Sequence, residues 1–467
     1  MSNFQSIIYF IPEIILIIAA IGFLLLTTFF KISDSKKYFL ISVSLIISLI
    51  ATLLSHSADG HGIFNNLLVW DSYGQFIKIF TLIIACVILI IRRKENCNEA
   101  SPSPVTEFGI GLLLLISVAF VSINANHLVA LFISLQILHL AAFFIVQRRN
   151  LSPRIITASW HDLIFDIFTS LIMLMGIALI YDTTGTFFIA EIGQILSAVT
   201  RMNFPLILGI ALLLVGFSFT ITGIYRLSWK LEILRTISAS DRLLLLTIPQ
   251  FIETTTLIRL LRVGLGLVGD WRPLTLMIGI FAVLTLLYPI IWLIKLRSAK
   301  DIIIVTSIAQ SGFGLLALCA GNISGDVAAL FYQVVLIFSL IAFTIGEILT
   351  INAKSSQLIA LASLIGIPLT AGFPAKYLVF ISLVQHSPFY YFLIVIGIGS
   401  AALMLIGYVR IVRQIIAAQG QFFNSPQKGS QLIFFIQILI NIILISIGFY
   451  WTPLTDYLQS IMTFCVP

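Results

Sequence analysis

The sequence predicts an all-α, polytopic integral membrane protein with about fourteen transmembrane helices. Hydrophobic residues make up 60% of its 467 residues and charged residues only 10%, whereas a soluble domain carries roughly 25% charged residues. The hydrophobic residues form runs close to the roughly 20 residues that a helix needs to cross a bilayer. Positive charges lie in the short segments between these runs. The net charge of +7 therefore indicates membrane topology and not nucleic-acid binding.

The apolar runs define the expected helices in chain order. The first run has no basic segment before it and continues past Pro12 and Glu13, so we expect a retained helix and not a cleaved signal peptide. The runs near 242–264 and 357–384 are the least regular. The expected spans lie near 6–30, 38–55, 74–92, 106–123, 127–147, 161–181, 204–224, 242–264, 274–294, 302–321, 327–350, 357–384, 389–412 and 432–454.

The segments between the spans alternate in charge. Most of the 26 lysines and arginines fall in every second connection, whereas the other connections hold Arg201, Arg272 and little else. The positive-inside rule then places the basic connections in the cytoplasm and both termini on the outer side. Among the outer segments, 56–73 is expected to be a solvated turn, and 183–203 is apolar enough to lie along the membrane interface. The basic connections carry Lys31, Lys36, Lys37, Arg92, Arg93, Lys94, Arg148, Arg149, Arg154, Arg226, Lys230, Arg235, Arg242, Lys295, Arg297, Lys300, Lys354, Arg410, Arg413 and Lys428.

No cofactor or metal site is expected in the chain. The four cysteines have no CxxC spacing and no neighbouring histidine cluster, so they predict neither zinc nor an iron–sulfur cluster. The sequence contains no phosphate-binding Walker loop and no dinucleotide fingerprint, which disfavours an ATP-driven transporter.

The most informative polar residue is Lys376, which follows a segment that breaks its helix. Pro368 and Pro374 each remove a backbone donor, and Gly366 and Gly372 weaken the helix further. Transporters use broken helices to place carbonyl groups and titratable side chains at membrane depth. Burial disfavours the charged form of an amine, so a lysine there is able to exchange a proton. The alternative is a lysine whose chain extends from a kinked helix end to the interface.

Other titratable residues lie in or beside the fifth, sixth and eighth spans. Asp162 and Asp166 share a helix face, because residues four apart are neighbours, and they fit either a proton relay or a solvated helix end. In the eighth span Glu253 is expected to pair with Arg259 or to serve a structural purpose. His139 in the fifth span fits a hydrogen bond to another helix equally well.

The sequence resembles the N-type antiporter-like subunit of proton-pumping NADH–quinone oxidoreductase (respiratory complex I), which is related to Mrp-type sodium/proton antiporter subunits. The resemblance covers almost the whole chain in order, and GIPLTAGFPAK at 366–376 is its most specific stretch. The other matching segments are Pro12-Glu13, Asp71 with Lys78, Glu107-Phe108, NANHLVALFISLQILHL at 124–140, GIALIYDTTGT at 176–186, GFSFTI at 216–221, Trp229, Pro249, KDIIIVTSIAQSGF at 300–313 and Tyr408 to Arg410.

The resemblance implies two inverted five-helix repeats, formed by helices 4–8 and 9–13, with breaks in helices 7 and 12. It divides the chain into N-terminal helices at 1–105, a first repeat at 106–264, a second repeat at 265–412 and a last helix at 413–467. It also implies proton translocation driven by quinone reduction in other subunits. NADH, FMN, iron–sulfur clusters and the quinone would then be bound by partner subunits and not by this one.

The resemblance assigns proton transfer to positions that this chain has largely changed. They fall on Gln136, His161, Thr220, Gln250 and Lys376, and a histidine of the family falls on Gln310. Lys376 retains the family residue, and His161 is a titratable substitute. Glutamine and threonine cannot carry a proton as a charged group. The proline that follows the family's helix-7 lysine is Tyr225 here, so a weaker break is expected in that helix.

Two accounts of the first repeat remain open. In one, it is a structural relic and only a route through Lys376 survives. In the other, a displaced relay runs through His139, His161, Asp162, Asp166 and Glu253, because a proton path needs titratable groups within hydrogen-bond reach and not particular residue types.

The expected setting is a prokaryotic inner membrane. The resemblance implies adjacent M-type and small K-type membrane subunits as partners, besides the lipid bilayer. Two alternatives remain: a subunit of an Mrp-type cation/proton antiporter, or a non-transporting structural or assembly paralogue.

Overall fold

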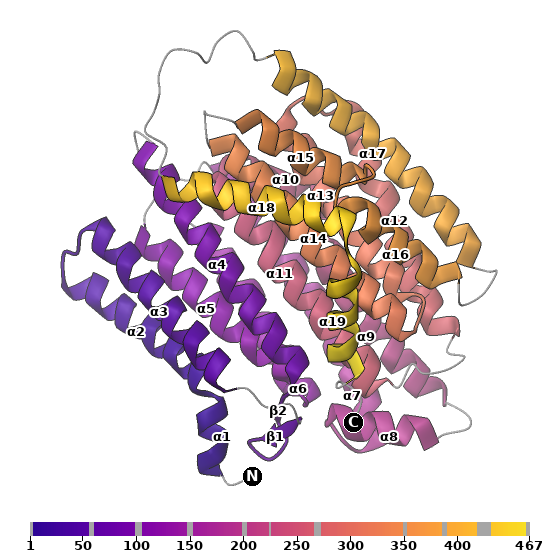
Figure 1. The fold of residues 1–467 in the computed structure, drawn as a ribbon. Helices are drawn as coiled ribbons and strands as arrows, with labels where there is room; N and C mark the ends of the chain where they lie inside the picture. Colours follow the sequence, from indigo (N-terminus) through magenta and orange to yellow (C-terminus); the bar gives the residue numbers. More distant parts are fainter. Residues whose placement is uncertain are drawn as a thin grey trace. The chain divides into compact units, whose positions relative to one another are not determined.

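The structure of the chain is a computed structural model, which describes residues 3–55, 60–98, 105–146, 153–198, 203–223, 226–265, 272–348, 353–384, 390–417 and 431–463. Within these residues, 13 helices are long and apolar enough to cross a membrane. The expected all-α, multi-pass membrane fold is therefore confirmed (Figure 1). The expected span at 357–384 is absent from the 13, because it consists of two shorter helices.

The chain divides into two compact units. The first comprises Met1–Thr220, Ile248–Leu267 and Ile461–Pro467, and the second comprises Ile221–Thr247 and Val268–Ser460. The four-part division that the resemblance implies stays a prediction.

The first unit is built mainly from the N-terminal helices. The expected span at 6–30 consists of two helices, because a new helix, α2, starts at Ile11. Pro12 lies in the first turn of α2, where a backbone N–H has no partner within the helix, so its absence removes no hydrogen bond. Its elements are α1 (Asn3–Tyr9), α2 (Ile11–Phe29), α3 (Asp34–Leu54), β1 (His61–Ile63), β2 (Leu68–Trp70), α4 (Ser72–Asn98), α5 (Val105–Asn124), α6 (Leu128–Val146), α7 (Pro153–Thr184), α8 (Ile189–Ala198) and most of α9 (Phe204–Thr222).

Two connections of this unit are structured. Within 56–73, β1 and β2 form an antiparallel hairpin in which His61 pairs with Trp70, and Trp70 is buried. This segment was expected to be a solvated turn: the turn at 64–67 is exposed at Asn65, Asn66 and Leu67, whereas the strands beside it bury Ile63, Leu68 and Trp70. His56 and Asp59 lie outside the described residues. The apolar stretch at 183–203 contains the short helix α8.

The second unit surrounds two buried helices. In α13 (Ala299–Leu318) and α14 (Ile323–Ile348), 94% of the residues in the apolar part of the helix are buried. In α17 (Tyr391–Ala417) and α18 (Gln431–Phe449), the corresponding shares are 33% and 28%. The outer helices therefore leave apolar side chains for the lipid. The remaining helices are α10 (Leu227–Thr236), α12 (Arg272–Lys295), α15 (Ala353–Ile365), α16 (Gly372–Val384) and α19 (Thr452–Thr463). Helix α11 (Ala239–Arg259), followed by the π-helical turn η2 (Leu260–Gly264), contributes to both units.

The two expected helix breaks are both present. Helix α15 ends at Ile365 and α16 begins at Gly372, with Gly366 at φ +87°, a conformation that favours glycine. Helix α9 ends at Thr222 and α10 begins at Leu227, with Gly223 at φ +53°. Tyr225, on which the expectation of a weaker break rests, lies outside the described residues.

Candidate functional site

Each unit contains buried titratable groups that cost free energy inside a membrane. An ionisable residue at the centre of a transmembrane helix costs roughly 2.5–3.5 kcal/mol on insertion scales, so those retained there call for partners or a function. Three pairs of buried side chains in the described part of the first unit meet this requirement.

The first pair joins α6 to α11. His139 Nε2 lies 2.7 Å from Glu253 Oε1, and both side chains are buried. Either atom of this contact is able to hold the shared proton, depending on the ring tautomer. The pair lies one helical turn beyond Gln136 on α6 and Gln250 on α11. Gln136 accepts a hydrogen bond from the hydroxyl of Ser170 on α7.

The second and third pairs share helix α4 and the segment before it. The amine of Lys78 forms a hydrogen-bonded ion pair with the carboxylate of Glu13 of α2 and lies 3.8 Å from the centre of the Trp70 ring. Both carboxylate oxygens of Asp71 accept from Arg259, at 2.6 and 2.7 Å, and Asp71 also accepts from the backbone N–H of Gly74 at 2.8 Å. Two cations and two carboxylates therefore balance one another in this region.

These contacts correct two sequence-based interpretations. Glu253 and Arg259 were considered as an ion pair, but Glu253 contacts His139 and Arg259 contacts Asp71. Asp71 was placed in a loop, and it does precede α4, but it is buried and paired. A lysine buried inside a membrane-spanning helix requires a nearby negative charge. The presence of Lys78 in the third span therefore could have identified Glu13 and Asp71 as candidate partners from the sequence.

The other candidates of the first unit lie on α7 and α9. His161 is exposed, and its Nδ1 lies 2.7 Å from the backbone oxygen of Thr157 on its own helix. Helix α7 starts at Pro153, so Asp166 is buried well inside it and is not at a solvated helix end. Asp162, one turn earlier, is half-buried. Thr220 is buried and donates to the carbonyl of Phe217 within α9.

In the second unit a buried amine lies at a helix break. Lys376 Nζ donates to the backbone oxygens of Leu364 and Ile365, at 2.8 Å each. These carbonyls are free to accept because α15 ends at Ile365 and the break leaves them without a helical donor. Pro374 lies in the first turn of α16, where it leaves the helix intact, and Pro368 lies within the break itself. The amine of Lys376 also lies 5.4 Å from the Phe313 ring centre.

A network of neutral hydrogen bonds adjoins this amine. Gln310 Nε2 donates to the same Leu364 oxygen at 3.0 Å and to the Tyr408 hydroxyl at 2.9 Å, while the Tyr332 hydroxyl donates to Gln310 Oε1. Lys376 and Tyr332 both line a cavity of about 10 Å³, which is close to the size that holds one water molecule. The tyrosines were not among the residues that the sequence singled out.

The sequence and the fold were compared with those of known proteins. The model of the family described as "NADH:quinone oxidoreductase/Mrp antiporter, TM" matches residues 125–359, half of the chain. The chain belongs to this family. The match includes the whole of α6, α11, α13 and α14, and hence His139, Glu253 and Gln310.

Curated members of the family and solved structures resemble the chain over most of its length. It is 24% identical to NADH-quinone oxidoreductase subunit N of Hydrogenovibrio crunogenus, covering 90% of each chain, and 24% identical to the protein of that name from Methylovorus glucosotrophus, covering 98% of each. A chain of respiratory complex I from Thermus thermophilus gives a TM-score of 0.76 at 17% identity, covering 96% of this chain and 99% of that one. A chain of the archaeal membrane-bound sulfane sulfur reductase gives 0.81 at 16% identity, covering 100% and 98%. At these identities the structural matches establish the fold alone.

Proposed function

We propose that the chain is the N-type membrane subunit of a proton-translocating NADH–quinone oxidoreductase. It would move protons across a prokaryotic inner membrane while partner subunits reduce the quinone. The family match and the relatives of that name, aligned over nearly the whole length, support this proposal. The observation that carries it is the Lys376 amine, buried at a helix break and held by two carbonyl oxygens.

The geometry suits a group that takes up and releases a proton. Carbonyl oxygens stabilise the charged amine by accepting its hydrogen bonds, while burial favours the neutral form. The third hydrogen on Nζ is available to a water molecule in the adjoining cavity, which Tyr332, Ser339 and Ser363 also line. The Ser339 hydroxyl donates to the Ser363 hydroxyl at 2.9 Å, so polar groups continue beyond the amine.

We propose a second proton-transfer site at the His139–Glu253 pair. His139 and Glu253 were both considered for a displaced relay, and they lie within hydrogen-bond distance of each other. An imidazole nitrogen and a carboxylate oxygen are both able to hold a proton, so a proton is able to pass between Nε2 and Oε1 over 2.7 Å. Arg259 cannot play this part, because a guanidinium keeps its proton. The proposal favours a displaced site over a first repeat that serves packing alone.

The test of the main proposal uses Lys376 variants in the assembled complex in membrane vesicles. Lys376→Ala removes the amine, and Lys376→Arg keeps a positive charge that cannot deprotonate. Both are expected to lower the number of protons moved per quinone reduced, whereas the half-buried Lys354→Ala on α15 should not. Unchanged translocation in both Lys376 variants would refute the role of this amine.

The second site has its own test in the same vesicles. Glu253→Gln keeps a hydrogen bond to His139 but removes the proton-accepting carboxylate, so translocation per quinone should fall to the level of Lys376→Ala. Glu253→Asp should restore part of it, because the acid returns. Equal translocation in Glu253→Gln and in the unaltered chain would reject the pair and leave the proposal for Lys376 intact.

The setting completes the proposal. Adjacent M-type and small K-type subunits would flank the chain, both termini would face outward, and NADH, FMN, iron–sulfur clusters and the quinone would be bound elsewhere in the complex. The fold is also shared with a chain of the Mrp complex from Dietzia sp., with a TM-score of 0.74 at 14% identity. An Mrp-type antiporter subunit is therefore the second candidate function. A sodium gradient that drives proton uptake without NADH would identify it.

A further inference from the structure

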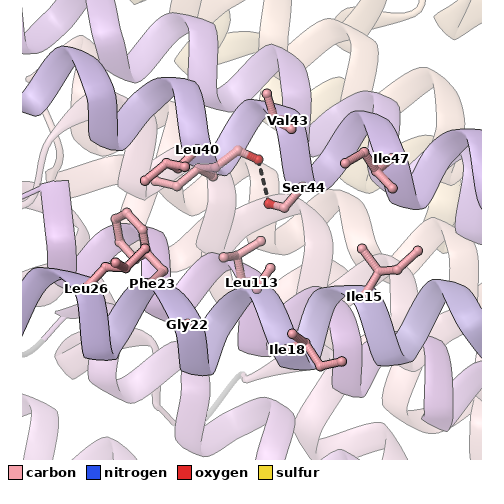
Figure 2. A pocket seen from close by; sticks show the side chains of 12 residues that line it. Ile15, Ile18, Gly22, Phe23, Leu26, Leu40, Val43, Ser44, Ile47 and Leu113 are labelled. Atoms are coloured by element: carbon pink, nitrogen blue, oxygen red, sulfur yellow. Dashed lines mark hydrogen bonds between the residues drawn. The ribbon is translucent and has the colours of Figure 1, made fainter.

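Helices α2 and α3 of the first unit run side by side (Figure 1), and a groove lies between them (Figure 2). Figure 2 shows a row of α2 residues facing a row of α3 residues, with Leu113 of α5 between them. The groove encloses a cavity of about 410 Å³. It stays open because the α2 face has Ala19 and Gly22 at its centre, and a Cβ placed on Gly22 would meet nothing within 4 Å.

The groove opens outward and has an apolar floor. Phe23, Ile41 and Leu113 at its base are at most 4% exposed, whereas Ile18 and Ile47 at its rim are 64% and 47% exposed. Its one polar side chain is Ser44, whose hydroxyl donates to the carbonyl of Ile41 at 2.8 Å (Figure 2). No polar group of the groove therefore awaits a partner, so the surface suits a hydrocarbon chain.

The two ends of the groove differ. At one end Ser48 of α3 donates to the carbonyl of Pro12 in α2 at 3.3 Å and joins the two helices. From Ile15 to Leu26 the α2 side of the groove extends for about 16 Å at the helical rise of 1.5 Å per residue. Half of a hydrocarbon core of roughly 30 Å is about 15 Å. The groove is thus about as long as the hydrocarbon layer of one lipid leaflet is thick.

The other end of the groove points to a basic connection. Residues 30–33 link α2 to α3, and Lys31 in this link and Lys36 in the first turn of α3 are exposed. Lys37 pairs with Asp34 at 2.9 Å, so this ion pair is neutral and two positive charges remain. A hydrocarbon-length groove that ends at uncompensated positive charge matches a lipid with a negatively charged headgroup.

We propose that the groove between α2 and α3 binds an anionic phospholipid. One acyl chain lies along Ile18, Gly22 and Leu26, and the phosphate lies near Lys31 and Lys36. The lipid covers apolar surface that the protein itself leaves open. Since the surrounding bilayer is also apolar, the groove fixes where the acyl chain lies, and the lysines determine the preference for an anionic headgroup over a neutral one. This site is independent of proton transfer.

The test uses the assembled complex in phosphatidylcholine vesicles that contain a small share of a photoreactive lipid. Two probes with the same photoreactive acyl chain are compared, one a phosphatidylglycerol and the other a phosphatidylcholine. Labelled peptides are then located by mass spectrometry. The anionic probe is expected to label α2 and α3 within 15–26 and 40–47 more strongly than the zwitterionic probe.

Matched variants separate the groove from its charges. Gly22→Leu fills the groove and should reduce labelling to that of an open helix face, whereas Gly399→Leu on α17, whose Cβ also meets nothing within 4 Å, should not. Lys31→Gln and Lys36→Gln should each weaken the preference for the anionic probe by about fivefold. Lys295→Gln and Arg297→Gln, also exposed, are the charge controls.

Three results would overturn the proposal. They are equal labelling by both probes, undiminished labelling in Gly22→Leu, and a groove that is labelled in the isolated chain but protected in the assembled complex. The last would identify a partner subunit as the occupant. Because Gly22 borders open space, loss of folding is not expected, and circular dichroism of the variants verifies it.

Discussion

The paired charges of the first unit and the Lys376 amine of the second unit are held in different ways. In the first unit three buried ionisable pairs are formed between side chains: Lys78 meets Glu13, Arg259 meets Asp71, and His139 meets Glu253. In the second unit the Lys376 amine is held by backbone oxygens at a helix break. Paired side chains neutralise one another, whereas carbonyl dipoles stabilise a proton without a permanent negative charge.

This difference indicates which buried groups stabilise the fold and which are able to transfer a proton. A pair such as Asp71–Arg259, with a guanidinium that keeps its proton, has little freedom to change charge. An amine on carbonyl oxygens changes charge without leaving an orphan carboxylate, because its partners are neutral in both states. The His139–Glu253 pair lies between these cases, since either member is able to hold the proton. Substitutions at these sites should therefore differ in kind as well as in size.

The largest expected effect on stability is that of Arg259→Met. It leaves Asp71 buried without its cation, and breaking one partner of a buried ion pair costs about 3–5 kcal/mol. The midpoint of thermal unfolding of the purified full chain measures it. The double variant Asp71→Asn with Arg259→Met should regain part of the loss, because no charge remains unpaired. A single variant as stable as the double variant would show that the pair is not buried as described.

A moderate effect is expected from Gly372→Ala at the helix-12 break. The added Cβ would lie 1.6 Å from the backbone oxygen of Ser363, so α15 and α16 would have to separate. Overpacking of this kind costs about 1–3 kcal/mol. Translocation should fall as well, because the Leu364 and Ile365 carbonyls would move from Lys376. Gly399→Ala is the control, since its Cβ meets open space. A tolerated Gly372→Ala would contradict the tight approach of the two helices.

The fold was largely predictable from the sequence, and the partners of its polar residues were not. Apolar runs and loop charges locate helices because a bilayer admits few other structures. The break at Gly366–Ala371 was predictable because Gly366, Pro368 and Gly372 weaken a helix locally. Which carboxylate meets Arg259 depends on helix packing between residues 188 positions apart, and periodicity contains no such information. The α1–α2 break and the hairpin at 61–70 were missed for a related reason, since both depend on short local contacts.

A smaller effect is expected from Tyr408→Phe. Its hydroxyl accepts a hydrogen bond from Gln310 at 2.9 Å beside Lys376, and a hydrogen bond of this kind contributes about 1 kcal/mol. Because the hydroxyl does not contact Lys376 in the described bonds, translocation should fall less than in Lys376→Ala. Unfolding midpoints and proton uptake by vesicles measure the two effects. A loss of translocation as complete as that of Lys376→Ala would place Tyr408 on the proton path itself.

The smallest effect is expected from His161→Ala, although the resemblance makes His161 a candidate proton carrier. The ring is exposed, and its Nδ1 lies 2.7 Å from the backbone oxygen of Thr157 on its own helix, so its removal opens no cavity in the buried core. Surface substitutions of this kind change stability by at most about 0.5 kcal/mol. Translocation per quinone should equal that of the unaltered chain, in contrast with Glu253→Gln. A substantial loss in His161→Ala would instead restore the longer relay along α7 and weaken the distinction between the buried pair and its exposed neighbours.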